Sequence, residues 1–187
     1  MTADTRATAL WRRIDLPGME RCELAGTPDG FRIAGTTLFS LDERAIEIRY
    51  SIALDAKWRT RIVGIHVRTP EETRSVALRA DGEGTWEVGG DPVPDLDGAI
   101  DIDLAWTPAT NTIPIRRLGL DVGMDAQISS AFVPFPDRVV SAKAQSYERL
   151  AERRYRFTSG DFAADLTVDG DALVTAYPGR WIAVPAP

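Results

Sequence analysis

Apolar and polar residues alternate along much of the chain, a pattern typical of β-strands with one buried face. Residues 46, 48, 50, 52 and 54 are apolar and share one face, with Glu47, Arg49 and Ser51 on the opposite face. Residues 62–68 alternate in the same way after the turn-forming segment 55–57, so the two runs predict a β-hairpin. Further strands are expected in the first half of the chain around residues 31–39, 76–78, 85–88 and 100–104.

The second half shows the same pattern less evenly. Strands are expected near residues 128–133, 155–157 and 162–168, and Asp169-Gly170 is a strong hairpin turn signal before a last strand over 173–177. Residues 142–153 are ambiguous. Their Ala, Glu, Leu and Arg content favours a helix, although the segment lies between strand-like neighbours and tertiary context can override propensity.

About ten strands with one or two short helices predict a mainly β fold, a strongly curved antiparallel sheet or a barrel. The chain has 187 residues and is 44% hydrophobic, which suffices for one continuous core. Neither a tandem repeat nor a linker divides it. We therefore expect residues 1–187 to form a single domain.

Charge and composition narrow the function classes. A net charge of −6 argues against binding to duplex nucleic acid, which needs a basic face. Residues 1–13 contain no apolar run long enough for a signal peptide or a membrane span, which predicts a cytoplasmic protein. The chain has a single cysteine and a single histidine, so a His/Cys zinc cluster cannot form. We expect Cys22 to be an unreactive residue of the core. We expect no metal and no cofactor.

Signals of catalysis are sparse. The chain has no Gly-x-Ser-x-Gly elbow and no glycine-rich phosphate loop. Asp101 and Asp103 lie two residues apart, so both face the same side of one strand. Such a pair resembles carboxylates that hold a divalent metal, but in an acidic chain a solvated outer face is the expected interpretation. We assign no catalytic residue.

The run from Thr107 to Leu118 combines turn formers, two prolines and two adjacent arginines. It predicts a fixed loop that ends in a helical turn beginning at Pro114. Arg116 and Arg117 then stand beyond a shaped loop, where their guanidinium groups suit a phosphate, a carboxylate or a cluster of sugar hydroxyls. An internal staple with two solvated arginines explains the same residues.

The five tryptophans, near predicted strand ends or turns, are expected to pack in the core. Trp58 is the exception, because Arg59 and Arg61 flank it beside a turn and could meet an anionic or sugar ligand. The five are Trp11, Trp58, Trp86, Trp106 and Trp181.

Several of these motifs occur together in a known family. The segment Asp55–Arg61, the run Thr107–Leu118, the triplet Gln145-Ser146-Tyr147, and Tyr177 with Trp181 resemble, in order and spacing, the bacterial glycolipid-binding family, a domain family formerly of unknown function. The likeness extends over nearly the whole chain, and the central run is its most specific part. Ala109 and Ile113 depart from the larger apolar residue and the leucine that the family more often carries there.

The resemblance implies a fold similar to bacterial lipoprotein carriers and mycobacterial lipid-carrier lipoproteins, with a curved sheet around an apolar cavity. It also implies non-catalytic binding of a glycolipid or another amphipathic molecule. An enzyme that uses a carboxylate pair on a sugar substrate, and a structural module that forms a dimer, remain the alternatives. The motif positions carried over as ligand-binding are Trp58, Arg61, Thr107, Asn111, Arg116, Arg117 and Tyr147.

Overall fold

A computed structural model describes residues 4–135 and 139–185. Within these residues, fifteen strands form one sheet, so the predicted mainly β fold is confirmed. The first eight strands are β1 (Asp4–Arg13), β2 (Gly18–Thr27), β3 (Gly30–Leu41), β4 (Arg44–Asp55), β5 (Thr60–Arg68), β6 (Thr73–Ala80), β7 (Trp86–Val88) and β8 (Asp91–Pro92). The others are β9 (Asp101–Leu104), β10 (Asp125–Val133), β11 (Ser141–Ala151), β12 (Arg154–Ser159), β13 (Phe162–Val168), β14 (Val174–Tyr177) and β15 (Trp181–Ala183).

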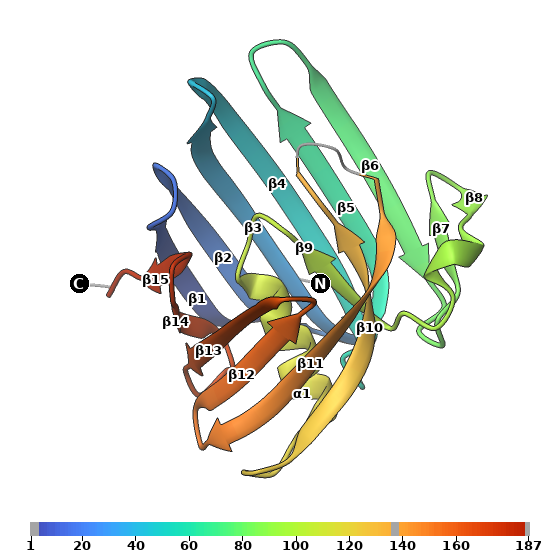
Figure 1. Ribbon diagram of the computed structural model, residues 1–187. Coiled ribbons are helices and arrows are strands. Elements are labelled where there is room, and N and C mark those ends of the chain that lie inside the picture. Colours follow the sequence, from blue (N-terminus) through green and yellow to red (C-terminus); the bar gives the residue numbers. More distant parts are fainter. Residues whose placement is uncertain (1–3, 136–138, 186–187) are drawn as a thin grey trace.

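The sheet consists of two runs of strands, which are joined by pairing between the first and the last strand of the chain. Strands β1 to β8 are antiparallel neighbours in sequence order, and strands β10 to β15 form a second antiparallel run. The runs meet where β1 pairs with β15, with Arg13 opposite Trp181. The N-terminal and C-terminal strands therefore lie side by side in the middle of the sheet (Figure 1).

The sheet is curled but not closed. Strand β9 is one edge and pairs in parallel with β10. Its start reaches back to the first run, because the Thr60 amide donates to the Ile100 carbonyl at 3.4 Å and the Thr60 hydroxyl accepts from the Ile102 amide at 3.2 Å. This near contact between β5 and β9 gives the two runs a shared interior.

A short helical segment lies inside the curl, between the two runs of strands (Figure 1). It consists of the 3₁₀ turn η2 (Ala109–Asn111) followed directly by α1 (Thr112–Leu118), and a second 3₁₀ turn, η1 (Pro94–Leu96), precedes β9. The helix ends at Gly119, whose φ of 55° is the left-handed conformation that glycine adopts without a steric cost. The Gly119 amide donates to the carbonyl of Ile115.

Two groups of buried apolar side chains fill the interior. The larger is built mainly from β1 to β9 and contains Trp11, Trp86 and Trp106, each no more than 1% exposed. The smaller lies on β11 to β14 and includes Tyr147, Phe157 and Leu166. Neighbouring residues of the central segment connect the groups, since Ile113 belongs to the larger and Ile115 to the smaller.

The structure decides one ambiguity and corrects one expectation. The ambiguous segment falls largely in strand β11 (Ser141–Ala151), because it pairs with β10 on one side and β12 on the other. Asp101 and Asp103 do not form a solvated outer face. Asp101 is 0% exposed and Asp103 is partly buried, because the helical segment and β11 place polar partners over that face of β9.

No helix among the described residues combines the length and apolar character needed to cross a membrane.

Candidate functional site

The segment from Thr107 to Asn111 is held in shape by its own polar side chains. The Thr107 hydroxyl accepts a hydrogen bond from the Ala109 amide at 3.0 Å, and the Asn111 side chain donates to the Pro108 carbonyl at 3.1 Å. All five residues from Thr107 to Asn111 are buried. The turn-forming residues of this run therefore fix its backbone, and the run forms one wall of a pocket.

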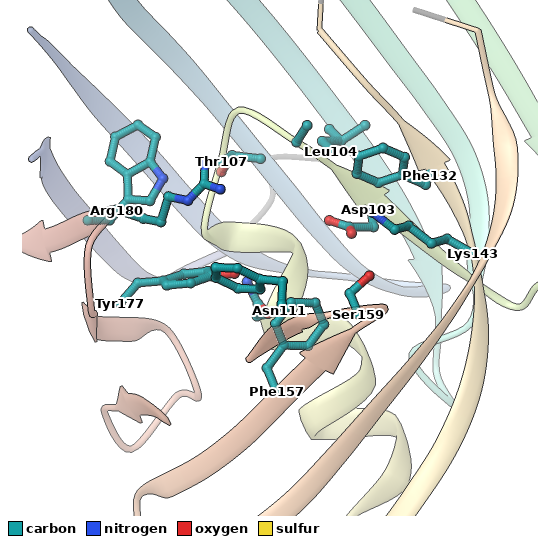
Figure 2. A pocket seen from close by; sticks show the side chains of 13 residues that line it. Asp103, Leu104, Thr107, Asn111, Phe132, Lys143, Phe157, Ser159, Tyr177 and Arg180 are labelled. Atoms are coloured by element: carbon teal, nitrogen blue, oxygen red, sulfur yellow. The ribbon is translucent and has the colours of Figure 1, made fainter. Parts of the chain in front are cut away.

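The pocket has a volume of about 200 Å³ and lies between this segment and the concave side of β10 to β15 (Figure 2). Polar and aromatic side chains from β9 to β15 and their connections line it. Figure 2 shows Asp103 and Lys143 on one side and Arg180 on the other. The lining residues are Asp103, Leu104, Ala105, Thr107, Asn111, Phe132, Lys143, Phe157, Ser159, Phe162, Tyr177, Arg180 and Trp181.

Asp103 supplies a carboxylate to the pocket and is held by two polar groups. Its Oδ2 accepts from the Gln145 amide at 2.6 Å, and its Oδ1 accepts from the Thr110 hydroxyl at 3.3 Å. Gln145 is itself fixed by the Ser130 hydroxyl at 2.8 Å. Burial raises the pKa of Asp103, while Gln145, Thr110 and the positive charge of Lys143 oppose the shift.

Ser159 is a buried polar residue of the pocket whose hydroxyl lacks a partner among the described residues. It is 8% exposed, and no described residue forms a hydrogen bond with its hydroxyl. Buried hydroxyls are nearly always hydrogen-bonded, so an orphan on a pocket wall indicates a position where a ligand or water completes the set. Figure 2 shows this hydroxyl directed into the pocket, near Phe157.

Asn111 is positioned from behind by Tyr147. The Tyr147 hydroxyl donates to the Asn111 side-chain oxygen at 2.9 Å, and the tyrosine is 2% exposed. Burial raises the pKa of Tyr147, so it remains a neutral donor. Tyr147 does not line the pocket itself. It orients the side-chain amide of Asn111, which does.

A buried carboxylate lies on the far side of Thr107. Oε1 of Glu20 accepts from the Tyr50 hydroxyl at 2.5 Å and from the Thr107 hydroxyl at 2.6 Å. Its Oε2 forms no hydrogen bond with the described residues. Burial raises the pKa of Glu20 to about 7, since these hydrogen bonds offset only part of the cost of removing the charge from water.

The two arginines of the central run bind protein groups. Arg117 forms two hydrogen bonds with Asp101, at 2.9 and 2.6 Å, from Nε and Nη2 to the two carboxylate oxygens. Arg116 donates to the carbonyls of Gly170 and Asp171 and to the Asp171 carboxylate. Neither arginine lines the pocket, and this geometry is that of the internal staple considered from the sequence.

Trp58 and Arg61 lie away from the pocket, Trp58 in the turn after β4 and Arg61 near the start of β5. Trp58 has a φ of 63°, stacks on Phe31 with ring centroids 4.1 Å apart, and lies under the Arg116 guanidinium at 5.7 Å. Arg61 is 3.9 Å from the Asp55 carboxylate. Trp58 therefore lies next to Arg116. Thr107 and Asn111 lie with Tyr147 in a separate place, at the pocket.

Several pocket residues were not singled out from the sequence, among them Lys143, Ser159 and Arg180. A signal for Ser159 existed. It follows Tyr155 and Phe157 at a spacing of two, so it is a polar residue on the buried face of a strand. Lys143 likewise precedes Gln145 and Tyr147 on the inward face of β11, but the helix-favouring composition of that segment left its conformation ambiguous.

The arrangement suits binding better than acid–base chemistry. Asp103 is the one carboxylate among the lining residues, and Asp101 is held by Arg117. Glycosidase chemistry needs two carboxyl groups facing one space, which this pocket does not provide. Within the described ranges, no three His, Cys, Asp or Glu side chains gather closely enough to hold a metal ion. Aromatic rings beside amide, hydroxyl and charged groups match the two-sided character of a sugar.

Comparison with known proteins agrees with this picture. Residues 8–182 match the family model described as "Putative glycolipid-binding". A crystal structure of a DUF1089 family protein from Pseudomonas aeruginosa is similar, with a TM-score of 0.78 and 32% sequence identity over 86% of this chain and 89% of that chain. A search of curated proteins gives no match. Because the matched residues span nearly the whole sheet, the chain belongs to the glycolipid-binding family.

Proposed function

We propose that this protein binds the polar head of a glycolipid or a related amphipathic molecule in the pocket beside Thr107, without chemical conversion. The observation that carries the proposal is the unpartnered Ser159 hydroxyl, buried in a pocket that also presents the Asn111 amide and the Asp103 carboxylate. A sugar hydroxyl can donate to the Asp103 carboxylate, and it can donate to or accept from the Ser159 hydroxyl and the Asn111 amide. The family description supports the same ligand class.

The size of the pocket defines which part of the ligand it would hold. Pockets for drug-sized molecules measure roughly 300–1,000 Å³. A volume of about 200 Å³ is smaller, so it suits the head group and the first part of an alkyl chain rather than a whole lipid. Phe132, Phe157 and Phe162 provide an apolar wall for a sugar face and for that first part of the chain.

The seven residues carried over by resemblance take different roles in this proposal. Thr107 and Asn111 contact the head group, and Tyr147 holds Asn111 in place. The remaining four stabilise the fold around the pocket: Trp58, Arg61, Arg116 and Arg117.

Native mass spectrometry with lipid extraction, on protein purified from a bacterial host, tests the proposal. We expect a bound amphiphile in the wild-type protein and its loss in Ala105→Trp, because Ala105 is exposed and lines the pocket. Ala163→Trp is the matched control, since Ala163 is also exposed but lies outside the pocket.

A titration with n-octyl β-D-glucoside in thermal melts gives an independent reading. Ligand that binds only the folded protein raises the melting temperature. No copurifying amphiphile together with no shift for any octyl glycoside would contradict the proposed function. A discovered turnover that depends on Asp103 would instead support an enzyme.

A further inference from the structure

Charges around the pocket do not balance. Lys143 and Arg180 face it from opposite sides, and Asp103 is the acidic residue that lines it. The positive charge of Lys143 acts on Asp103, whose pKa it lowers, but the ammonium forms no ion pair within 4.0 Å with a carboxylate of the described residues and lies 4.3 Å from the centre of the Phe132 ring. The aromatic ring offers the ammonium a partial partner but does not neutralise it.

Arg180 is also incompletely neutralised. Its nearest carboxylate is Asp15, at 3.6 Å. That carboxylate already binds Arg13 through two hydrogen bonds of 3.0 and 2.8 Å. Two guanidinium groups thus share one carboxylate, and the Arg180 side chain remains 48% exposed at the edge of the pocket.

The carboxylate of Asp103 is directed toward protein donors. Gln145 and Thr110 each donate to one of its two oxygens. Among the residues that line the pocket, Lys143 and Arg180 carry two positive charges against the one negative charge of Asp103. The whole chain carries a net charge of −6, so this local excess is opposite in sign to the protein's overall charge.

We infer that the head group bound in this pocket is an acidic sugar, whose carboxylate or phosphate is placed between Lys143 and Arg180 while its hydroxyls meet Ser159 and Asn111. This inference rests on the proposed function and names the substrate class of the same site. An anion here gains charge-assisted hydrogen bonds from both cations. A neutral sugar leaves both cations without that partner, so charge provides the basis for selecting among glycolipids.

Calorimetric titration with three detergents of equal chain length tests the inference. The probes are n-octyl β-D-glucoside, n-octyl β-D-glucuronide and n-octyl glucoside 6-phosphate, which differ in the charge of the head. We expect at least one acidic probe to bind tenfold or more tightly than the neutral one, with an affinity that falls as salt rises. The two acidic probes then distinguish a carboxylate from a phosphate.

Variants at Lys143 test whether the pocket causes the preference for an acidic probe. Lys143→Met keeps the aliphatic stem and removes the charge, so it should weaken the preferred acidic probe about tenfold and change the glucoside less than twofold. Lys143→Arg should retain the preference. Lys57→Met, at an exposed lysine outside the pocket, is the matched control and should bind like the wild type.

The outcomes separate the two proposals. Equal binding of neutral and acidic probes, or a preference that Lys143→Met leaves intact, overturns the acidic head group while the proposed function stands. Failure of all three probes to bind, together with no copurifying amphiphile, overturns both. Arg180→Met is a second test of the preference for an acidic probe. Arg180 is exposed, and its replacement leaves the ion pair of Arg13 with Asp15 in place.

Discussion

Arg117 and Asp101 form a two-point ion pair in which the carboxylate side chain is 1% exposed and the guanidinium 17% exposed. The pair joins the last turn of α1 to strand β9. Burial raises the pKa of Asp101, and the guanidinium of Arg117 opposes that shift. The helical segment that forms one wall of the pocket is therefore fixed to the sheet by this contact.

Replacing Arg117 with methionine should destabilise the protein by about 3–5 kcal/mol, because it leaves a buried carboxylate without its partner. Urea unfolding measures the change. The double variant Arg117→Met with Asp101→Leu should recover much of the loss, since it removes the unpaired charge as well.

Arg156→Met is the control for this ion pair. Arg156 pairs with Asp165 on the surface, where both side chains are at least one-third exposed, and exposed pairs contribute little. We expect its unfolding midpoint to stay close to the wild type. A similarly small effect for Arg117→Met would contradict the structural role of the pair.

Gly35 leaves space for the ring of Tyr50 on the neighbouring strand. A Cβ at residue 35 would lie 2.5 Å from the Tyr50 hydroxyl oxygen and 2.7 Å from Cζ. Because Tyr50 is 4% exposed, its ring has little room to move. Gly35→Ala should therefore cost roughly 1–3 kcal/mol through overpacking, measured by chemical denaturation.

Gly64 is a matched test of the same substitution. It lies in β5, and a Cβ there would have no heavy atom within 4 Å. Since alanine restricts the unfolded chain more than glycine, Gly64→Ala should be neutral or stabilising by up to about 1 kcal/mol. Equal losses at Gly35 and Gly64 would show that contact with Tyr50 is not the cause.

The fold could be predicted from the sequence because strand alternation is a local signal. The hairpin of β4 and β5 and the strands near Asp169-Gly170 follow directly from apolar spacing and turn residues. Strand β11 could not be predicted in this way. Its residues favour helix, and only pairing with β10 and β12, which are distant contacts, decides its conformation.

The candidate site was predictable only in part for a similar reason. Thr107 and Asn111 belong to a contiguous run of turn formers, so their importance is visible locally. The pocket beside them is assembled from seven strands and their connections, and no sequence spacing indicates that Lys143 faces Arg180. The adjacent guanidinium groups of Arg116 and Arg117 suggested a ligand site. Their partners, Asp101 and Gly170–Asp171, are distant in the sequence and are known only from the fold.

Glu20 should make stability depend on pH. Its pKa is raised from 4.5 to about 7 in the folded protein, so between these values the folded state binds more protons than the unfolded state. The free energy of unfolding therefore falls as pH rises from about 4.5 to 7. Its contribution is most favourable below that window and is lost above it.

Glu20→Gln should remove this dependence. The amide oxygen can still accept from Tyr50 and Thr107, and no charge needs to be buried. At pH 8 we expect the variant to be more stable by up to roughly 3 kcal/mol, from about 1.4 kcal/mol per pKa unit. Unfolding at pH 5 and pH 8 measures the difference, and an equal effect at both pH values would contradict a titrating Glu20.

Tyr147→Phe tests whether the hydroxyl behind the pocket positions Asn111. The substitution keeps the ring that packs on Phe157, at a centroid distance of 5.1 Å, and removes the donor to the Asn111 side-chain oxygen. An acceptor left buried without its partner costs about 1–3 kcal/mol, so the melting temperature should fall. The affinity for the octyl glycoside that binds the wild type should fall as well, because the Asn111 amide is then held only by its hydrogen bond to the Pro108 carbonyl.

Tyr155→Phe is the control for this effect, since Tyr155 lies in the same apolar group on the adjacent strand. Its hydroxyl forms no hydrogen bond with the part of the chain that the structure describes, so both stability and affinity should stay near wild type. A positioning role predicts that Asn111→Ala lowers affinity at least as much as Tyr147→Phe, and that combining the two adds little further loss. Additive losses would instead mean that Tyr147 affects binding independently of Asn111.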